Sequence, residues 1–309
     1  MKTKFNKNIK FIVLFIFSVV ALLTLNKLNL LNFEILFKSI KKHPDLIFLS
    51  GVIYAISILL GSLRYKIVLK GFNYKLKLKY SLKITASSIF YGQWFPGSSA
   101  LIELFRIFFL KQHIDIKLKE AFLSAIYDKA IGLVSFIILC LFCVLIKYDL
   151  LEQSNYYFLT LILIFSLFII NKTPAIILKI FNINYKSQNY FLISTEMIIS
   201  LLISGLIVIS YFLISKTTNA NLNFIDIAIM MPFIAIIGIL PIGLGNLGGL
   251  QIGTLLIFQF VSENNSEIVS MSVIFALITI LINSSFGLIF LKSTLNIFKK
   301  ALIKYEKKI

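Results

Sequence analysis

Long uninterrupted apolar runs constrain this chain more than any other feature of its sequence. Runs of sixteen residues or more recur along the 309 residues, and about twenty helical residues cross a bilayer core of roughly 30 Å. Hydrophobic residues make up 59% of the chain and charged residues only 14%, which is far less charge than a soluble domain carries. We therefore predict an all-α polytopic membrane protein that forms a single integral membrane domain over residues 1–309, with no soluble domain.

Six of these runs are long enough to be full transmembrane helices. They cover residues 8–26, 46–63, 121–146, 156–171, 190–215 and 267–291.

Two further apolar stretches, 82–110 and 224–261, are interrupted near their middle. The first is broken at Pro96 and Gly97; the second is broken at Pro241, Gly245, Gly248 and Gly249. Proline removes a backbone donor, and broken backbone survives in lipid only where protein or trapped water satisfies it. We predict that each stretch is a re-entrant pair of half-helices; one or two kinked, fully spanning helices are the alternative.

The distribution of basic residues predicts the orientation. With this set of spans, the segments on one side hold 22 Lys and Arg and those on the other side hold 6. Because cytoplasmic loops are rich in Lys and Arg, this asymmetry places both termini in the cytoplasm. In a bacterial cell the protein would be a multi-pass protein of the inner membrane.

The two halves of the chain show the same order of apolar segments. A shift of 145 residues carries the first three spans onto the last three and Pro96 onto Pro241. Each half, 1–150 and 151–309, would cross three times, so the second half would be inverted relative to the first. Inverted repeats with paired broken segments point to a transport site between the halves; a duplicated but inert scaffold is the alternative.

Four charged residues fall at membrane depth near the first break. Glu103 and Arg106 are three residues apart and share one helix face, while Asp128 and Lys129 lie near the start of the next span. Charges at this depth usually face a cavity or one another. Arg106 could bind an anionic headgroup while Glu103 orients it, or the two could form an internal ion pair. Asp128 could meet Arg106 or a ligand while Lys129 reaches toward the interface, and an ordinary interfacial pair is equally compatible.

The second break offers neutral groups instead of charges. Asn246 and Gln251 flank a glycine-rich turn, and Gln251 is the 145-residue counterpart of Arg106. Glycines expose backbone N–H groups at a half-helix N-terminus, where a phosphate could bind. The four-residue spacing of Gly245, Gly249 and Gly253 equally suits close helix packing.

Several function classes are excluded or unsupported. The net charge of +18 is spread over short loops between apolar runs, which argues against a nucleic-acid-binding face. The sequence shows no metal-ligand spacing, so we expect no metal and no cofactor. Cys140 and Cys143 have CxxC spacing inside an apolar run, and we interpret them as small core residues.

Two segments together resemble the lysylphosphatidylglycerol synthase transmembrane region, a flippase-like integral membrane protein family. The matching residues are Pro96, Gly97, Glu103, Arg106, Asp128 and Lys129 in the first segment, and Pro241, Gly245 and Gly248 in the second. Lys129 stands where the family usually has Arg, Ile102 and Asn246 where it has Gly, and Gln251 where it has Glu. Relatives that make lysyl-lipid carry a soluble aminoacyltransferase domain; we expect none here, and hence no lipid aminoacylation.

The leading hypothesis is an inner-membrane flippase or transporter of an anionic lipid, either a phospholipid or a polyprenyl-phosphate-linked glycan. One alternative is a membrane glycosyltransferase that uses a polyprenyl-phosphate sugar donor, with Asp128 or Glu103 as base. The other is an accessory protein that binds lipid or a partner enzyme of lipid or glycan synthesis. We favour a non-enzymatic role, and the expected partner is a membrane lipid with an anionic headgroup.

Overall fold

The described part of the chain is all helical, as the apolar runs predict. The computed structural model describes residues 27, 33–95, 98–147, 190–220, 222–239, 249–259, 262 and 264–306, and no strand occurs in these ranges. The predicted spans 8–26 and 156–171 lie outside the described residues. So do Pro96, Gly97, Pro241, Gly245, Asn246 and Gly248.

Four described helices are long and apolar enough to cross a membrane. They are α3 (Pro44–Gly71), α6 (Leu118–Lys147), α8 (Tyr190–Thr218) and α11 (Asn265–Glu306). Each contains one of the predicted spans, so four of the six are confirmed as helices of sufficient length. Two helices extend well beyond the apolar run: α3 continues eight residues past position 63, and α11 continues fifteen past position 291.

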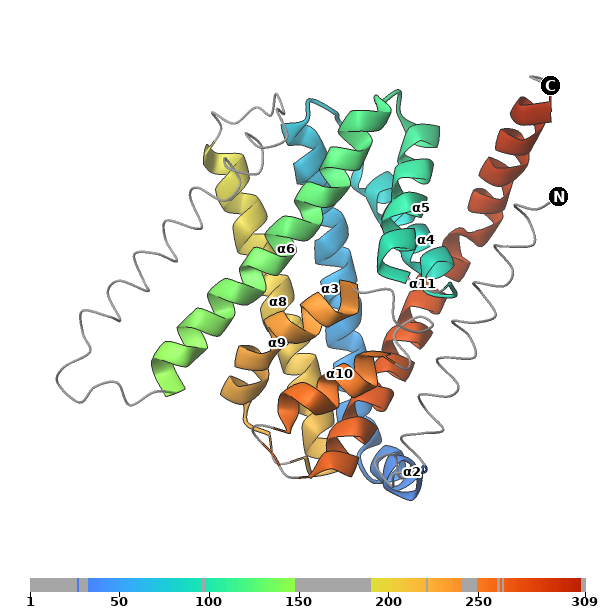
Figure 1. Cartoon of the computed structure of the whole chain (residues 1–309). Helices are drawn as coiled ribbons and strands as arrows, with labels where there is room; N and C mark the ends of the chain where they lie inside the picture. The colour runs from blue at the N-terminus through green and yellow to red at the C-terminus, as the bar shows by residue number, and fades with distance from the viewer. Residues whose placement is uncertain are drawn as a thin grey trace.

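Helices α3 and α8 form a central antiparallel pair (Figure 1). The Ser50 and Ser210 hydroxyls are 2.6 Å apart near one end, and the Arg64 guanidinium donates to the Ser200 hydroxyl nearer the other end. Residue numbers therefore rise along α3 as they fall along α8. Consequently the C-terminal ends of α3 and α8 lie at opposite ends of the bundle.

The first broken segment is a hairpin of two short helices, α4 (Leu78–Gly92) and α5 (Ser98–His113). Short loops connect α4 to the end of α3 and α5 to the start of α6, so the hairpin's outer ends lie on one side (Figure 1). The 15 residues of α4 reach only about 22 Å at 1.5 Å per residue. The shape matches the predicted pair of half-helices.

Close packing and aromatic rings hold this hairpin together. A Cβ atom on Gly92 would lie 2.7 Å from the backbone nitrogen of Ile102, so α4 and α5 touch where only glycine fits. The ring of Tyr91 packs on those of Phe105, Phe109 and Phe298, with centroid distances between 5.3 and 5.8 Å. Because Phe298 belongs to α11, these rings fix the first hairpin to that helix.

The second broken segment gives α9 (Phe224–Ile239) and α10 (Gly249–Phe258), which are connected to the end of α8 and the start of α11. They therefore approach from the end of the bundle opposite to α4 and α5 (Figure 1). A Cβ on Gly253 would lie 2.7 Å from Cγ2 of Ile237, so these helices also pack closely at a glycine. A short helix, α2 (Phe33–Lys42), lies at the start of α3.

The close approach at Gly92 predicts that a single added methyl group lowers the stability of the fold. Gly92→Ala should lower the stability of the protein by about 1–3 kcal/mol, because the added Cβ meets backbone and not a flexible side-chain end. Gly61→Ala in α3 is the matched control, because nothing lies within 4 Å of its added Cβ. Thermal unfolding in detergent measures both variants. Equal midpoints for Gly92→Ala and the unsubstituted protein would contradict the described packing.

Candidate functional site

Five charged side chains from α3, α5 and α6 form one connected group, the charge cluster. Its members are Arg64, Glu103, Arg106, Asp128 and Lys129. Four of the five are the charged residues that the sequence singled out near the first break. The cluster holds three cations and two carboxylates.

Asp128 is the centre of the cluster. Its Oδ1 accepts from Nε of Arg64 at 2.8 Å, and its Oδ2 accepts from a terminal nitrogen of Arg106 at 3.0 Å. The Asp128 side chain is only 5% exposed. One carboxylate from α6 therefore binds guanidinium groups from both α3 and α5, which ties three helices together by charge-assisted hydrogen bonds.

Arg106 is enclosed by its partners. The same terminal nitrogen lies 3.1 Å from Glu103 Oε2, and the guanidinium carbon lies 4.9 Å from the centroid of the Tyr65 ring. Arginine suits this combination because its planar cation both pairs with carboxylates and stacks on aromatic faces. In this conformation Arg106 is part of an internal ion-pair network.

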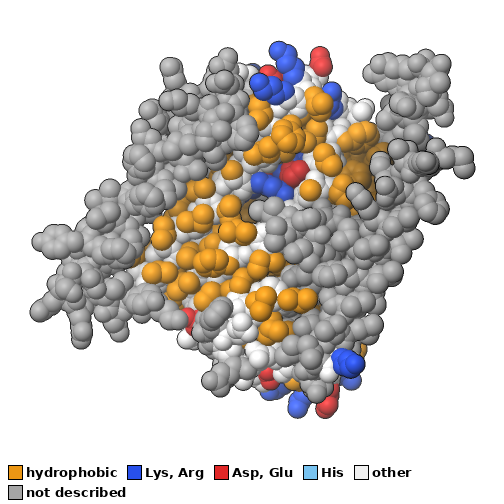
Figure 2. Space-filling model, in the orientation of Figure 1, with side chains coloured by type: hydrophobic (Ala, Val, Ile, Leu, Met, Phe, Trp, Pro, Cys, Tyr) orange, Lys and Arg blue, Asp and Glu red, His pale blue; other side chains and the backbone are white. Residues whose placement is uncertain are grey.

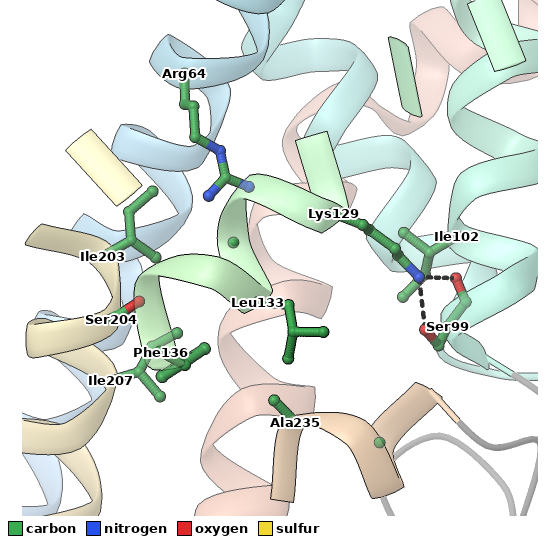
Figure 3. Close-up of a pocket in the computed structure, with 12 residues that line it drawn as sticks. Arg64, Ser99, Ile102, Lys129, Leu133, Phe136, Ile203, Ser204, Ile207 and Ala235 are labelled. Atoms are coloured by element: carbon green, nitrogen blue, oxygen red, sulfur yellow. Dashed lines mark hydrogen bonds between the residues drawn. The ribbon is translucent and has the colours of Figure 1, made fainter. Parts of the chain in front are cut away.

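Lys129 points away from Asp128, as adjacent helical residues do. Its Nζ donates to the backbone oxygen and the hydroxyl of Ser99, at 2.9 and 2.6 Å, and lies 3.7 Å from Glu103 Oε1. These contacts direct the side chain from α6 toward α5 (Figure 3). At 33% exposure it is the most accessible ionic side chain of the cluster.

Arg64 is a member of the cluster that the sequence reasoning missed. The predicted span ends at position 63, which places Arg64 in a loop, whereas α3 continues through it to Gly71. Besides Asp128, it donates to the Ser200 hydroxyl of α8 at 3.1 Å. A Cβ on Gly132 would lie 3.3 Å from a guanidinium nitrogen of Arg64, so a glycine leaves space for this group. One signal was available: Arg64 and Arg106 are the only arginines in a chain with 31 basic residues.

A second buried carboxylate lies near the cluster on α8. Glu196 is fully buried and accepts a hydrogen bond from the Tyr127 hydroxyl at 3.1 Å. Its backbone oxygen accepts from Ser200, the residue that Arg64 also contacts. The local sequence does not predict this contact, because Tyr127 and Glu196 are 69 residues apart.

A cavity of about 380 Å³ begins at the charge cluster (Figure 3). Its polar lining side chains are Arg64, Ser99, Lys129 and Ser204, and Figure 3 shows Arg64 apart from Lys129 and Ser99, with α6 between them. Its remaining walls are mostly apolar and come from α5, α6, α8 and α9: Ile102, Leu133, Phe136, Ile203, Ile207 and Ala235. Among the described lining residues, Arg64 and Lys129 supply the charges, and Arg106 is not one of the lining residues. The cavity thus combines two cationic side chains with mostly apolar walls.

The charges of the structure are not confined to its two ends. Figure 2 shows basic and acidic side chains in the middle of a face that is otherwise largely hydrophobic. Large apolar side chains are exposed on neighbouring helices, including Phe142 on α6, Phe233 on α9 and Leu256 on α10. Such exposure suits contact with lipid chains. A charged group in such a face is a polar site on an otherwise apolar surface.

The predicted residues of the second break are placed differently. Gly249 begins α10, and Gln251 is buried two residues later. The side-chain amide of Gln251 donates to the backbone oxygen of Ser272 at 3.5 Å, which connects α10 to α11. Neither residue of this hydrogen bond belongs to the charge cluster.

The central position of Asp128 predicts a large loss of stability when its charge is removed. Asp128→Asn leaves Arg64 without an anionic partner and Arg106 with Glu103 alone, and breaking a buried pair costs about 3–5 kcal/mol. Asp115→Asn is the control, because Asp115 is an exposed loop residue. Thermal unfolding in detergent should show a strongly lowered midpoint for Asp128→Asn only. Equal midpoints for the two variants would show that the network does not stabilise the fold.

Comparison with known proteins gives one match. Searches of curated proteins and of solved structures found nothing similar. The family model described as the lysylphosphatidylglycerol synthase TM region matches residues 10–287. That range covers most of the chain, including every charged residue of the cluster and both hairpins, so the resemblance noted from the sequence motifs is confirmed. The protein belongs to the lysylphosphatidylglycerol synthase transmembrane region family.

Proposed function

We propose that this protein moves an anionic amphiphile, a phospholipid or a polyprenyl-phosphate-linked glycan, from one leaflet of the inner membrane to the other. The observation that carries the proposal is a cavity that two cationic side chains, Arg64 and Lys129, and mostly apolar walls line together. A phosphate would bind between Arg64 and Lys129, and the hydrocarbon chain would lie along Leu133, Phe136 and Ile207. A family defined by a lipid synthase membrane region is compatible with a lipid-related function.

The charge balance of the cluster favours a ligand that brings negative charge. Three cations face two carboxylates, which leaves one positive charge uncompensated within the cluster. An uncompensated charge at bilayer depth is costly. Bound phosphate would remove much of this cost, and Lys129, the most accessible ionic side chain of the cluster, is the group best placed to meet it.

The helix order supports an inverted repeat. Helices α3, α4, α5 and α6 are followed by α8, α9, α10 and α11 in the same sequence of long, short, short and long. Their starting residues differ by 146 to 151 positions, close to the predicted shift of 145. We infer that the halves 1–150 and 151–309 are inverted repeats, because the two hairpins approach from opposite ends.

The cavity lies where these hairpins come near each other. Ser99 and Ile102 of α5 line it from the first hairpin, and Ala235 and Gly238 of α9 line it from the second. Rocking of one hairpin against the other would open the cavity first to one leaflet and then to the other, as in other inverted-repeat transporters.

The proposed orientation follows from the basic residues at one end of the bundle. The described loop between α3 and α4 and the adjoining helix ends carry Lys66, Lys70, Lys75, Lys77 and Lys79. By the positive-inside rule this end faces the cytoplasm, and both termini would lie on the same side.

The glycosyltransferase alternative needs a carboxylate that is free to accept a proton. Asp128 contacts two arginines, and Glu103 lies within 4 Å of both Arg106 and Lys129. Both carboxylates are therefore engaged in ion pairs in this conformation, which leaves neither free to take a proton from a substrate. The geometry therefore supports lipid binding better than catalysis. The accessory-protein alternative shares the binding site and differs only in the absence of movement.

Removal of the Lys129 charge tests the proposal. In vesicles that contain the purified protein, a fluorescent anionic phospholipid should become accessible to an external quencher faster than in protein-free vesicles. Lys129→Gln should slow this movement about tenfold, because a hydrogen bond to a charged group is worth about 1.5–3 kcal/mol. Lys77→Gln, in an exposed loop, is the charge-matched control. If the protein accelerates no phospholipid or polyprenyl phosphate, the transport proposal fails; binding without movement would favour the accessory role.

Filling of the apolar part of the cavity gives an independent test. Ala235→Phe adds a ring to the wall contributed by α9 and leaves every member of the charge cluster in place. We expect lipid movement to fall to near the protein-free rate while the unfolding midpoint changes little. Ile236→Phe is the control, because Ile236 is 46% exposed and does not line the cavity. Unimpaired movement in Ala235→Phe would exclude this cavity as the path.

A further inference from the structure

The short helix α2 presents a basic stripe on its outer face. Leu36 and Ser39 are buried, with Ile35 and Ile40 beside them. The exposed residues recur at helical spacing on the opposite face: Glu34, Phe37, Lys38, Lys41 and Lys42. Phe37, in the middle of this stripe, is 60% exposed. An exposed aromatic ring among lysines is typical of a helix that lies in a membrane interface.

The position of α2 fits that arrangement. Figure 1 shows α2 nearly end-on at the foot of the bundle, so its axis runs across the direction of the long helices. The chain turns at Pro44 into α3, whose exposed apolar face begins at once with Phe48, 74% exposed, and Leu49, 45% exposed. Helix α2 therefore lies at the level where an apolar surface meets a polar end.

Two hollows adjoin the lysines. A shallow groove of about 720 Å³ is lined by Glu34, Phe37, Lys38, Lys41 and Lys42. A smaller recess of about 200 Å³ lies between α2 and the adjacent ends of α8 and α11, where Lys38 and Lys42 face Thr217, Thr218 and Glu267. Among the described residues that line these hollows, three lysines outnumber two carboxylates, Glu34 and Glu267.

From these observations we infer that α2 binds the phosphate headgroups of anionic phospholipids in its leaflet, with Phe37 inserted among their chains. The ligand is an anionic lipid because the helix combines a lysine stripe with an apolar anchor at the boundary of the bilayer. This site is separate from the charge cluster. Arg64 lies twenty residues beyond Pro44 on α3, which is about 30 Å along the helix.

The distribution of charge strengthens the inference. On the side that the sequence assigns to α2, only 6 of the 31 basic residues occur, and Lys38, Lys41 and Lys42 are three of them. Half of the basic residues on that side are thus gathered on one ten-residue helix. The positive-inside rule disfavours lysines on this non-cytoplasmic side. A local anionic ligand would account for three lysines on one short helix.

Tryptophan fluorescence in the full-length protein tests the inference. The chain has one tryptophan, Trp94, so the double variant Trp94→Phe, Phe37→Trp places the only fluorophore on α2. This protein is reconstituted in bilayers that contain brominated phosphatidylglycerol or brominated phosphatidylcholine, each of which quenches tryptophan on contact. We expect brominated phosphatidylglycerol to quench several-fold more strongly at low mole fraction. The preference should disappear in 0.5 M salt, because salt screens the lysine charges.

Charge-removal variants supply the matched comparison. Lys38→Gln, Lys41→Gln and Lys42→Gln together should abolish the preference for the anionic lipid, whereas Lys75→Gln, Lys77→Gln and Lys79→Gln at the other end of the bundle should preserve it. Equal quenching by the two lipids would overturn headgroup recognition, and absence of quenching by either would overturn the interfacial position of α2. The salt titration needs no lysine substitution, so a poorly folded variant does not block the test. Neither readout depends on lipid movement, so failure here is distinct from failure of the proposed function.

Discussion

The bridge that Asp128 makes between Arg64 and Arg106 is the interaction on which the rest of the site depends. One carboxylate joins three helices through contacts of 2.8 and 3.0 Å, at a depth where an isolated charge would be expensive. With Arg106 occupied by Asp128 and Glu103, the network presents its remaining positive charge through Arg64 and Lys129. The network thus has two roles: it stabilises the packing of α3, α5 and α6, and it supplies two cationic side chains to the lining of a mostly apolar cavity.

The hairpins place that cavity between two ends of the molecule. Close packing at Gly92 and Gly253 makes each hairpin compact, and the aromatic rings around Tyr91 fix the first one to α11. The second hairpin contributes Ala235 and Gly238 to the cavity wall opposite Lys129. Because α5 and α9 both contribute to its wall, the cavity lies between the two hairpins, where a polar ligand could be bound. Helix α2, at the far end of α3 from the cluster, supplies a separate surface for anionic headgroups.

Much of this architecture could be predicted from the sequence, because lipid restricts the possible structures. The lengths of the apolar runs predict the four long helices of the described residues, and the Pro-Gly break predicts that α4 and α5 are two short helices. The three-residue spacing of Glu103 and Arg106 predicts that these two side chains form a pair. The contact between Asp128 and Arg64 was harder to predict, because the two residues are 64 positions apart in the sequence. In addition, Arg64 follows the end of an apolar run, although α3 continues through it without a break. Hydropathy marks where apolar residues stop, not where a helix ends, so a charged residue in the last turns of a span is taken for a loop residue.

The central claim is that the cavity holds an anionic amphiphile between Arg64 and Lys129. Native mass spectrometry of the gently purified protein tests this claim most directly, because it weighs the lipid that stays bound. The account predicts one tightly retained anionic lipid on the variant that lacks the three α2 lysines, and loss of that lipid when Ala235→Phe is added to the same variant. Retention of the lipid by this combined variant, or the recovery of zwitterionic lipids alone, would contradict the account.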